Sequence, residues 1–389
     1  MLSECYENVA RTRRFAGVMS FRSILILNLF ITGVLTISGQ TAVATPTPAT
    51  PASRNLEPKD ADPKNHGVVT AEKIKRWIEF DAFSFGTRYR YVDLNSETAS
   101  VNQQQFQIVA RAKFKFDHKG KYSVNAGLFT GNNILSGWNN TGIGTGDGAA
   151  PLYLKHLYFD AKPAKWIEIQ AGGFSVTSGE NTEITGYDND VYVMGERVSI
   201  RRPKDLYFDE ISVTNAFIGD ITTPNVFRRF KRLGNSNYHQ VMVRKTFNKR
   251  VGFSADYTFD SGTDTLRQAV NVKTPELHFL DRVLFENYQR LAPDTGYGFS
   301  LFGEKKLNGR FTLGGGFTHI DNVMLNADRF QRGNRVFITN TIKFTRELSL
   351  NTFLIQAVGP LPTAISPRTR LDIILTYNFL ETLHRLKLN

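Results

Sequence analysis

Hydrophobic and polar residues alternate along residues 106–129. The even positions from Phe106 to Phe116 are apolar, whereas the odd positions include Arg111, Lys113 and Lys115. A period of two places successive side chains on opposite faces of a β-strand, while a helix needs a period of about 3.6. Residues 117–120 have the Asp and Gly of a tight turn, and the alternation then resumes. The segment predicts a β-hairpin with one apolar and one cationic face.

The same alternation recurs from Trp77 to the end of the chain. Residues 265–291 fit two strands, with a helical or plug segment as the alternative. The connections alternate between short turns and long polar loops, a pattern typical of membrane-spanning β-barrels and not of soluble sandwiches. The long loops are expected at residues 131–150, 176–190, 219–236, 321–334 and 359–368.

These strands predict an all-β fold, a transmembrane antiparallel up-and-down β-barrel of about 16 strands, within a range of about 14 to 18. The short turns would face the periplasm and the long loops the exterior. We expect the barrel to span residues 73–380 and a periplasmic tail to follow at 381–389. The last strand ends on Tyr377 and Phe379, which is typical of such barrels, although the chain continues to Asn389.

The longest apolar run, residues 24–38, lies near the N-terminus. Arg22 precedes it and an Ala-Val-Ala sequence follows it, which gives the basic, apolar and small-residue regions of a secretory signal peptide. The run is shorter than the roughly 20 residues of a spanning helix, the alternative interpretation. We expect a cleaved signal peptide at residues 1–44, with translation starting at Met19 rather than at the first methionine. Residues 45–72, rich in Pro and Thr, are expected to form a periplasmic linker.

Charge and cysteine content narrow the functional classes. The 389-residue chain has a formal net charge of +12, and Cys5, its single cysteine, lies in the expected signal peptide. A mature chain without thiols suits an oxidising periplasm, and export argues against nucleic acid as a partner of the basic chain. The sequence contains no serine-nucleophile, phosphate-loop or metal-binding motif. We therefore expect a bacterial outer-membrane protein that is not an enzyme and holds no cofactor or metal.

Residues 151–203 carry a more specific pattern. They combine a strand, a Pro-containing turn, a Trp-led strand ending in Gly-x-Phe, a loop rich in Thr and Ser, and the sequence Gly-Glu-Arg-Val-Ser at 195–199. Together with the Arg-rich hairpin before them, residues 106–203 resemble the phosphate-selective porin family. The resemblance implies a homotrimeric pore that admits small anions such as phosphate.

The polar face of the strands predicts the lining of a water-filled lumen. Acidic residues are few on this face, namely Glu168, Asp256 and Asp372. A lumen with excess positive charge concentrates anions and excludes cations. For residues near turns, the alternative is a place at the rim. The expected pore-lining residues are Arg111, Lys113, Lys115, Arg244, Arg250, Arg310, Arg335, Lys343 and Arg370.

Two loops hold further candidates. The third long connection, residues 178–190, is expected to fold inward as a constriction loop, with a solvated surface loop as the alternative; its acids are Glu180, Glu183, Asp188 and Asp190. Residues 227–232 combine two phenylalanines with four basic residues, a patch suited to binding lipopolysaccharide, nucleic acid or another anionic polymer. If the loop is external, lipopolysaccharide is the nearest anion. The alternative is again a solvated loop. The basic residues of this loop are Arg228, Arg229, Lys231 and Arg232.

The function that follows is passive diffusion of small, mainly anionic solutes through an outer-membrane porin in contact with lipid and lipopolysaccharide. Two alternatives are kept. A barrel for polysaccharide export or adhesion would need a wide lumen lined by aromatic residues and arginine. A barrel enzyme such as a lipase would need a Ser and a His on the lipid-facing rim, and the sequence shows no such pair.

Overall fold

The computed structural model describes residues 77–94, 100–177, 179–180, 191–201, 206–274, 278–324, 331–361 and 367–386. All of them belong to one compact unit, Asp62–Asn389. The expected signal peptide and linker lie outside the described residues. No helix within the described ranges is long and apolar enough to span a membrane.

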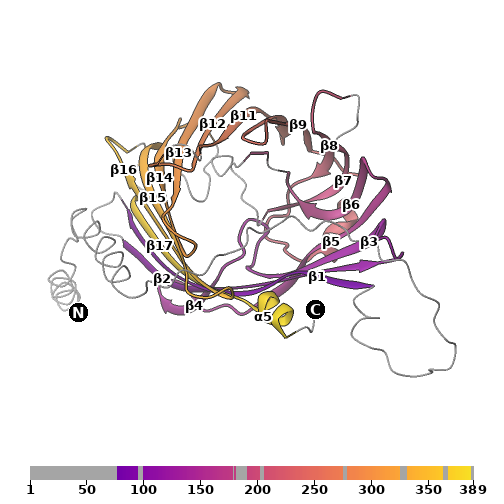
Figure 1. The fold of residues 1–389 in the computed structure, drawn as a ribbon, viewed down its shortest axis with the longest axis horizontal. Coiled ribbons are helices and arrows are strands. Elements are labelled where there is room, and N and C mark those ends of the chain that lie inside the picture. Colours follow the sequence, from indigo (N-terminus) through magenta and orange to yellow (C-terminus); the bar gives the residue numbers. More distant parts are fainter. Residues whose placement is uncertain are drawn as a thin grey trace, which may run out of the picture. The chain divides into compact units, whose positions relative to one another are not determined.

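Seventeen β-strands form one sheet in the described part of the chain, and the view in Figure 1 looks along its interior. The sequence alternates with period two because each strand has two unlike faces. The strands are β1 (Ile78–Leu94), β2 (Ser100–Lys115), β3 (Tyr122–Thr130), β4 (Asn139–Gly144), β5 (Leu152–Ala164), β6 (Ile167–Ser175), β7 (Tyr192–Arg201), β8 (Glu210–Phe217), β9 (Tyr238–Phe247), β10 (Val251–Asp260), β11 (Thr263–Lys273), β12 (Arg282–Ala292), β13 (Gly296–Lys306), β14 (Phe311–Ile320), β15 (Gly333–Lys343), β16 (Leu348–Ala357) and β17 (Pro367–Asn378).

The sheet closes on itself through its first and last strands. β1 pairs antiparallel with β2 on one side and with β17 on the other. β3 and β4 both pair with β2, at residues 109–115 and 103–106, so together they take the place of one strand. The result is a closed antiparallel barrel of 16 strands, as the sequence predicts. Residues 265–291, for which the sequence left a helical or plug segment open, supply most of β11 and most of β12.

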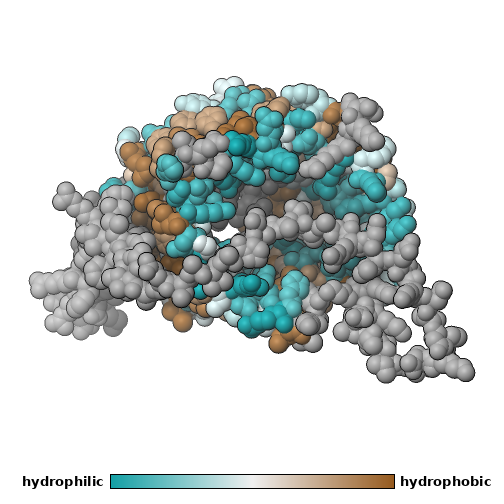
Figure 2. Space-filling model, viewed as in Figure 1, coloured by the Kyte–Doolittle hydropathy of each residue, from teal (hydrophilic) through white to brown (hydrophobic). Residues whose placement is uncertain are grey.

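The two faces of the barrel have opposite polarity. On β9, the outward side chain of Val241 is 46% exposed, whereas the inward Gln240 is 3% exposed. On β8, Val213 points outward between the buried Ser212 and Thr214. A soluble barrel would bury its apolar face, so this arrangement fits lipid outside and water inside. Figure 2 shows hydrophilic residues bordering the opening of the barrel.

Aromatic side chains gather on the outer face near both ends of the strands. At the end with the short turns, ring contacts link Trp77 with His118, and Phe159 with Phe116 and Tyr122. At the opposite end, the rings of Tyr297 and Phe299 both lie near His319. Two such girdles mark the interfaces of a membrane-spanning barrel.

Some connections differ from the pattern expected from the sequence. Residues 139–144, within an expected loop, form β4. The connections at 261–262 and 293–295 are short although they lie at the end with the long loops. The 219–236 loop contains α4 (Val226–Arg229) and the 3-10 helix η1 (Phe230–Arg232), and α5 (Phe379–Arg385) follows β17. Arg385 of α5 forms an ion pair with Glu347 at 3.2 Å between Nη1 and Oε1.

Glycines on β14 let aromatic rings lie flat on the inner wall. The rings of Phe302 and Phe337 are stacked with centroids 6.0 Å apart, from the strands on either side of β14. A Cβ atom on Gly316 would approach the Leu301 carbonyl oxygen to 2.0 Å and the Phe337 ring to 2.9 Å. Backbone cannot yield as a flexible side chain can, so this position excludes any side chain.

We expect Gly316→Ala to lower the free energy of unfolding by about 1–3 kcal/mol, because overpacking forces the backbone and the ring apart. The measurement is urea unfolding of the protein in detergent micelles, followed by circular dichroism. Gly309→Ala is the matched control, since a Cβ there meets no atom within 4 Å. Equal unfolding midpoints for the two variants would contradict the packing argument.

Candidate functional site in the lumen

Three arginines converge on one carboxylate on the inner face of β1 and β17. Arg90 Nε and Nη2 donate hydrogen bonds to Asp372 Oδ1 and Oδ2 at 2.8 and 3.1 Å, and Arg370 Nη2 donates to Oδ2 at 2.6 Å. Arg88 Nη1 lies 4.0 Å from the same Oδ2. The register accounts for the cluster, because Arg90 lies directly opposite Asp372. The arginine cluster, Arg88, Arg90, Arg370 and Asp372, places positive charge on the lumen wall.

The connection between β3 and β4 packs on this cluster. The guanidinium carbon of Arg88 lies 4.3 Å from the ring centroid of Trp138. A Cβ atom on Gly86, which shares the face of Arg88, would meet the Trp138 ring at 3.2 Å. Lys155 Nζ donates hydrogen bonds to the carbonyls of Asn133 and Ser136 at 2.8 and 2.7 Å. Residues 131–138 therefore fold into the barrel and narrow its lumen.

Glu180, from the predicted constriction loop, lies against the inner face of β9–β11. Its Oε1 accepts a hydrogen bond from Arg244 Nε at 2.8 Å, and its Oε2 accepts one from Asn271 Nδ2 at 2.9 Å. Its backbone N–H donates to Ser254 Oγ at 2.8 Å. The start of this loop is thus tied to the barrel interior. The other candidate acids of the loop lie outside the described residues: Glu183, Asp188 and Asp190.

Ion pairs hold the remaining acids that were expected on the lumen face. Glu168 Oε2 lies 2.6 Å from Arg201 Nη1, and Lys162 Nζ lies 3.0 Å from Glu168 Oε1. Asp256 pairs with Arg267, and both side chains are buried. In the part of the chain that is described, no three His, Cys, Asp or Glu side chains are grouped to hold a metal ion.

Several of the expected pore-lining residues have structural partners. Lys115 Nζ lies 2.7 Å from Glu79 Oε2. Arg335 is fully buried and donates hydrogen bonds to the carbonyls of Gln331, Arg332 and Pro367, so it anchors a connection. Arg244 and Arg370 bind the carboxylates described above.

The other expected residues divide between the wall and the ends of the barrel. Arg111 and Lys113 lie on the same face of β2, and Arg111 lines an interior cavity. Lys343 is the last residue of β15. Arg250 and Arg310 lie in the turns that precede β10 and β14. This agrees with the alternative interpretation, in which residues near turns lie at the rim of the barrel.

Two of the four basic residues in the basic loop form hydrogen bonds within the protein. Arg229 is fully buried, donates to the carbonyls of Tyr192 and Gly219, and lies 4.7 Å from the Tyr192 ring centroid. Arg232 Nε donates to Asp220 Oδ2 at 2.9 Å, and this hydrogen bond lowers the pKa of the Asp220 carboxyl. The remaining two, Arg228 and Lys231, are exposed.

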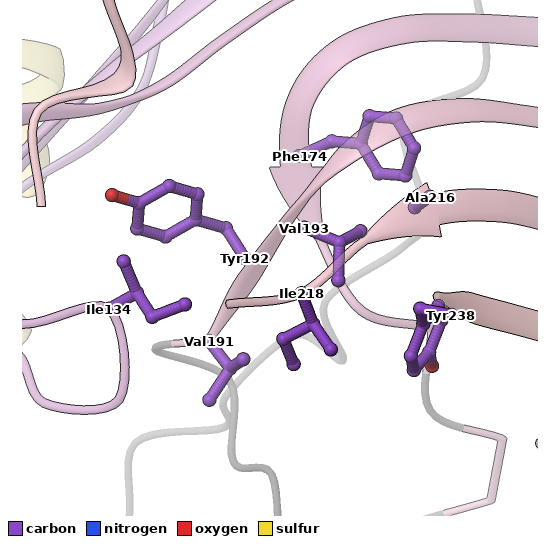
Figure 3. Close-up of a cluster of buried hydrophobic side chains, with 8 residues drawn as sticks. All are labelled: Ile134, Phe174, Val191, Tyr192, Val193, Ala216, Ile218 and Tyr238. Carbon is purple, nitrogen blue, oxygen red and sulfur yellow. The ribbon is translucent and has the colours of Figure 1, made fainter. Parts of the chain in front are cut away.

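An apolar cluster at one end of strands β6–β9 packs against this loop and against the β3–β4 connection. Four strands and three connections contribute side chains to the cluster, and Figure 3 shows them gathered there. Tyr192 donates its hydroxyl hydrogen to the Pro224 carbonyl, which fastens the loop to the cluster. The cluster consists of Ile134, Phe174, Val191, Tyr192, Val193, Ala216, Ile218 and Tyr238.

Sequence reasoning missed several inward arginines. Arg88 and Arg90 alternate with tyrosines in the sequence Arg-Tyr-Arg-Tyr, a signal that the strand pattern could have supplied. Arg197 entered only through the family resemblance. It lies on β7, lines the same cavity as Arg111, and its guanidinium carbon is 4.5 Å from the Phe174 ring centroid.

No protein-family model matches the chain, and no curated protein sequence matches it significantly. The fold is similar to solved bacterial porins. A mutant of the Rh. blastica porin is 11% identical, with a TM-score of 0.50, over 78% of this chain and 100% of that one. OprB of Pseudomonas putida is 9% identical, with a TM-score of 0.51, over 79% of this chain and 95% of that one. The barrel thus has the fold of bacterial porins, and these two matches do not support the phosphate-selective family in particular.

Proposed function

We propose that this chain is a porin of the bacterial outer membrane, a water-filled channel through which small solutes diffuse passively. One observation carries the proposal: the barrel is closed, apolar outside and polar inside. Lipid can contact the outer face without meeting an unpaired strand edge, and water can fill the interior. The similarity in fold to solved porins supports the same function and the same membrane.

Anions are the favoured solutes in this proposal. In the described part of the barrel, inward strand positions hold more basic than acidic residues, and the arginine cluster is the densest group of them. Fixed positive charge between low-dielectric walls raises the local concentration of anions. Phosphate is one candidate solute, on the strength of the sequence resemblance.

The inward connections favour small solutes over a polymer. Residues 131–138 and 179–180 occupy part of the lumen, which argues against the wide channel that polysaccharide export would need. Assembly as a homotrimer and contact of Arg228 and Lys231 with lipopolysaccharide belong to the proposal as well. Their support is the family resemblance for the trimer, and the exposure of these two cations for the lipopolysaccharide contact.

Planar-bilayer recording tests the channel itself. We expect the purified protein to insert with stepwise conductance and, under a KCl gradient, to give a reversal potential of the sign that marks chloride preference. The reason is the basic lumen wall. A potassium preference would overturn the charge assignment, and an absence of conductance would overturn the porin.

Substitution in the arginine cluster tests the origin of selectivity. Arg90→Gln removes one positive charge from the lumen wall and should lower the chloride-to-potassium permeability ratio by roughly twofold or more. Arg90→Lys keeps the charge and should retain most of the preference.

Arg346→Gln is the matched control for this series, because Arg346 is exposed in the turn before β16, where salt screens its charge over about 10 Å at 0.1 M. It should leave the ratio nearly unchanged. An equal effect of Arg90→Gln and Arg346→Gln would show that selectivity does not arise at the cluster.

A further inference from the structure

A cavity of about 360 Å³ opens on the inner wall between β2 and β8. The segment 175–177, which leads into the predicted constriction loop, forms part of its border. Two arginines, Arg111 and Arg197, line it together with His156, Tyr158, Gln170 and Phe174. Cavities of this volume suit small organic molecules. Most of the lining residues are polar or charged, which suits a charged solute.

Neither Arg111 nor Arg197 has a carboxylate partner among the described residues. Arg111 Nε is buried without a hydrogen-bond partner. Arg197 donates to Thr214 Oγ1, Gln170 Oε1 and the Ser175 carbonyl, all of them neutral acceptors. A buried guanidinium donor without an acceptor is costly, so an anion that enters the cavity gains a ready partner.

Aromatic rings hold both guanidinium groups. The guanidinium carbon of Arg111 lies 5.1 Å from the Phe129 ring centroid, and that of Arg197 lies 4.5 Å from the Phe174 centroid. Stacking on a ring uses none of the N–H groups of a guanidinium. The three hydrogen bonds of Arg197 therefore leave two of its five N–H groups for a planar acceptor. Tyr158 and Phe174, whose rings meet edge to face at 6.1 Å, add an apolar surface for the rest of a ligand.

The charge of the cavity matches a monoanion. Arg201 and Glu210 also line it, but they pair with each other at 3.1 Å between Nε and Oε1. The remaining charged side chains of the lining are the cations Arg111 and Arg197 and the carboxylate of Asp81, which leaves one excess positive charge. A monoanion neutralises this excess charge, whereas a phosphate dianion would leave the occupied cavity with one uncompensated negative charge, which is costly away from water.

We propose that this cavity binds a small organic monocarboxylate, with its carboxylate at Arg111 and Arg197 and its apolar body on Tyr158 and Phe174. The site gives the channel a saturable step for this class of solute. The inference rests on the proposed function in so far as the solute reaches the cavity through the lumen.

Benzoate is the probe, and the protein is the full chain in detergent micelles. Isothermal titration should show saturable binding of benzoate, no binding of the neutral benzyl alcohol, and weaker binding of inorganic phosphate. Arg111→Gln should weaken benzoate binding by about tenfold, the loss expected for one charge-assisted hydrogen bond. Asp81→Asn should tighten it, since the repelling carboxylate is gone. Arg346→Gln, in a distant turn, should leave it unchanged.

Four results would overturn the proposal: no binding of benzoate, binding of benzyl alcohol as tight as that of benzoate, binding of phosphate as tight as that of benzoate, or equal affinity in the wild type and Arg111→Gln. Where Arg111→Gln fails to fold, Asp81→Asn takes its place: benzoate binding that this variant leaves unchanged or weakens would also overturn the proposal. Bilayer recordings separate this site from the porin function. Chloride conductance without benzoate binding would refute the site alone, whereas Arg111-dependent binding without conductance would refute the channel alone.

Discussion

The backbone hydrogen bonds between β1 and β17 are the constraint on which the rest of the structure depends. A strand edge in lipid has no water to pair with, so the sheet has to close. Closure fixes the register of two strands that lie far apart in the sequence, and this register sets Arg90 opposite Asp372. The arginine cluster is therefore a direct consequence of how the barrel closes.

The closed barrel also reverses the distribution of residues found in soluble proteins, with apolar side chains outside and polar side chains inside. The apolar side chains go to lipid, so the interior has to accommodate charges at close range. Most of the described inward acids are satisfied locally by an arginine or lysine on the same or a neighbouring strand, as with Asp256 and Arg267. Breaking such a buried pair would leave an uncompensated charge and strongly destabilise the fold, so these pairs help to hold neighbouring strands together.

The number of strands and the direction of their side chains could be predicted from the sequence, because the two faces of each strand contact different solvents. Residues 251–259 and 371–379 show the resulting period of two. β4 was missed because Asn139–Gly144 is short and has no apolar face. The partner of Arg90 could not be predicted, since it lies 282 positions away and depends on the closing register. The carbonyl partners of Arg335 could not be predicted either, because every residue type has a main-chain carbonyl.

The inward cations differ in what they are free to do. Arg335 and Arg244 hold connections in place, and their guanidinium groups are occupied by carbonyls and by Glu180. Arg111 has a buried donor without an acceptor and rests on a ring. All of them add to the electrostatic field that attracts anions, but only a cation with free donors can make a specific contact with a solute. General anion preference and recognition of one solute class can therefore arise from different arginines of the same wall.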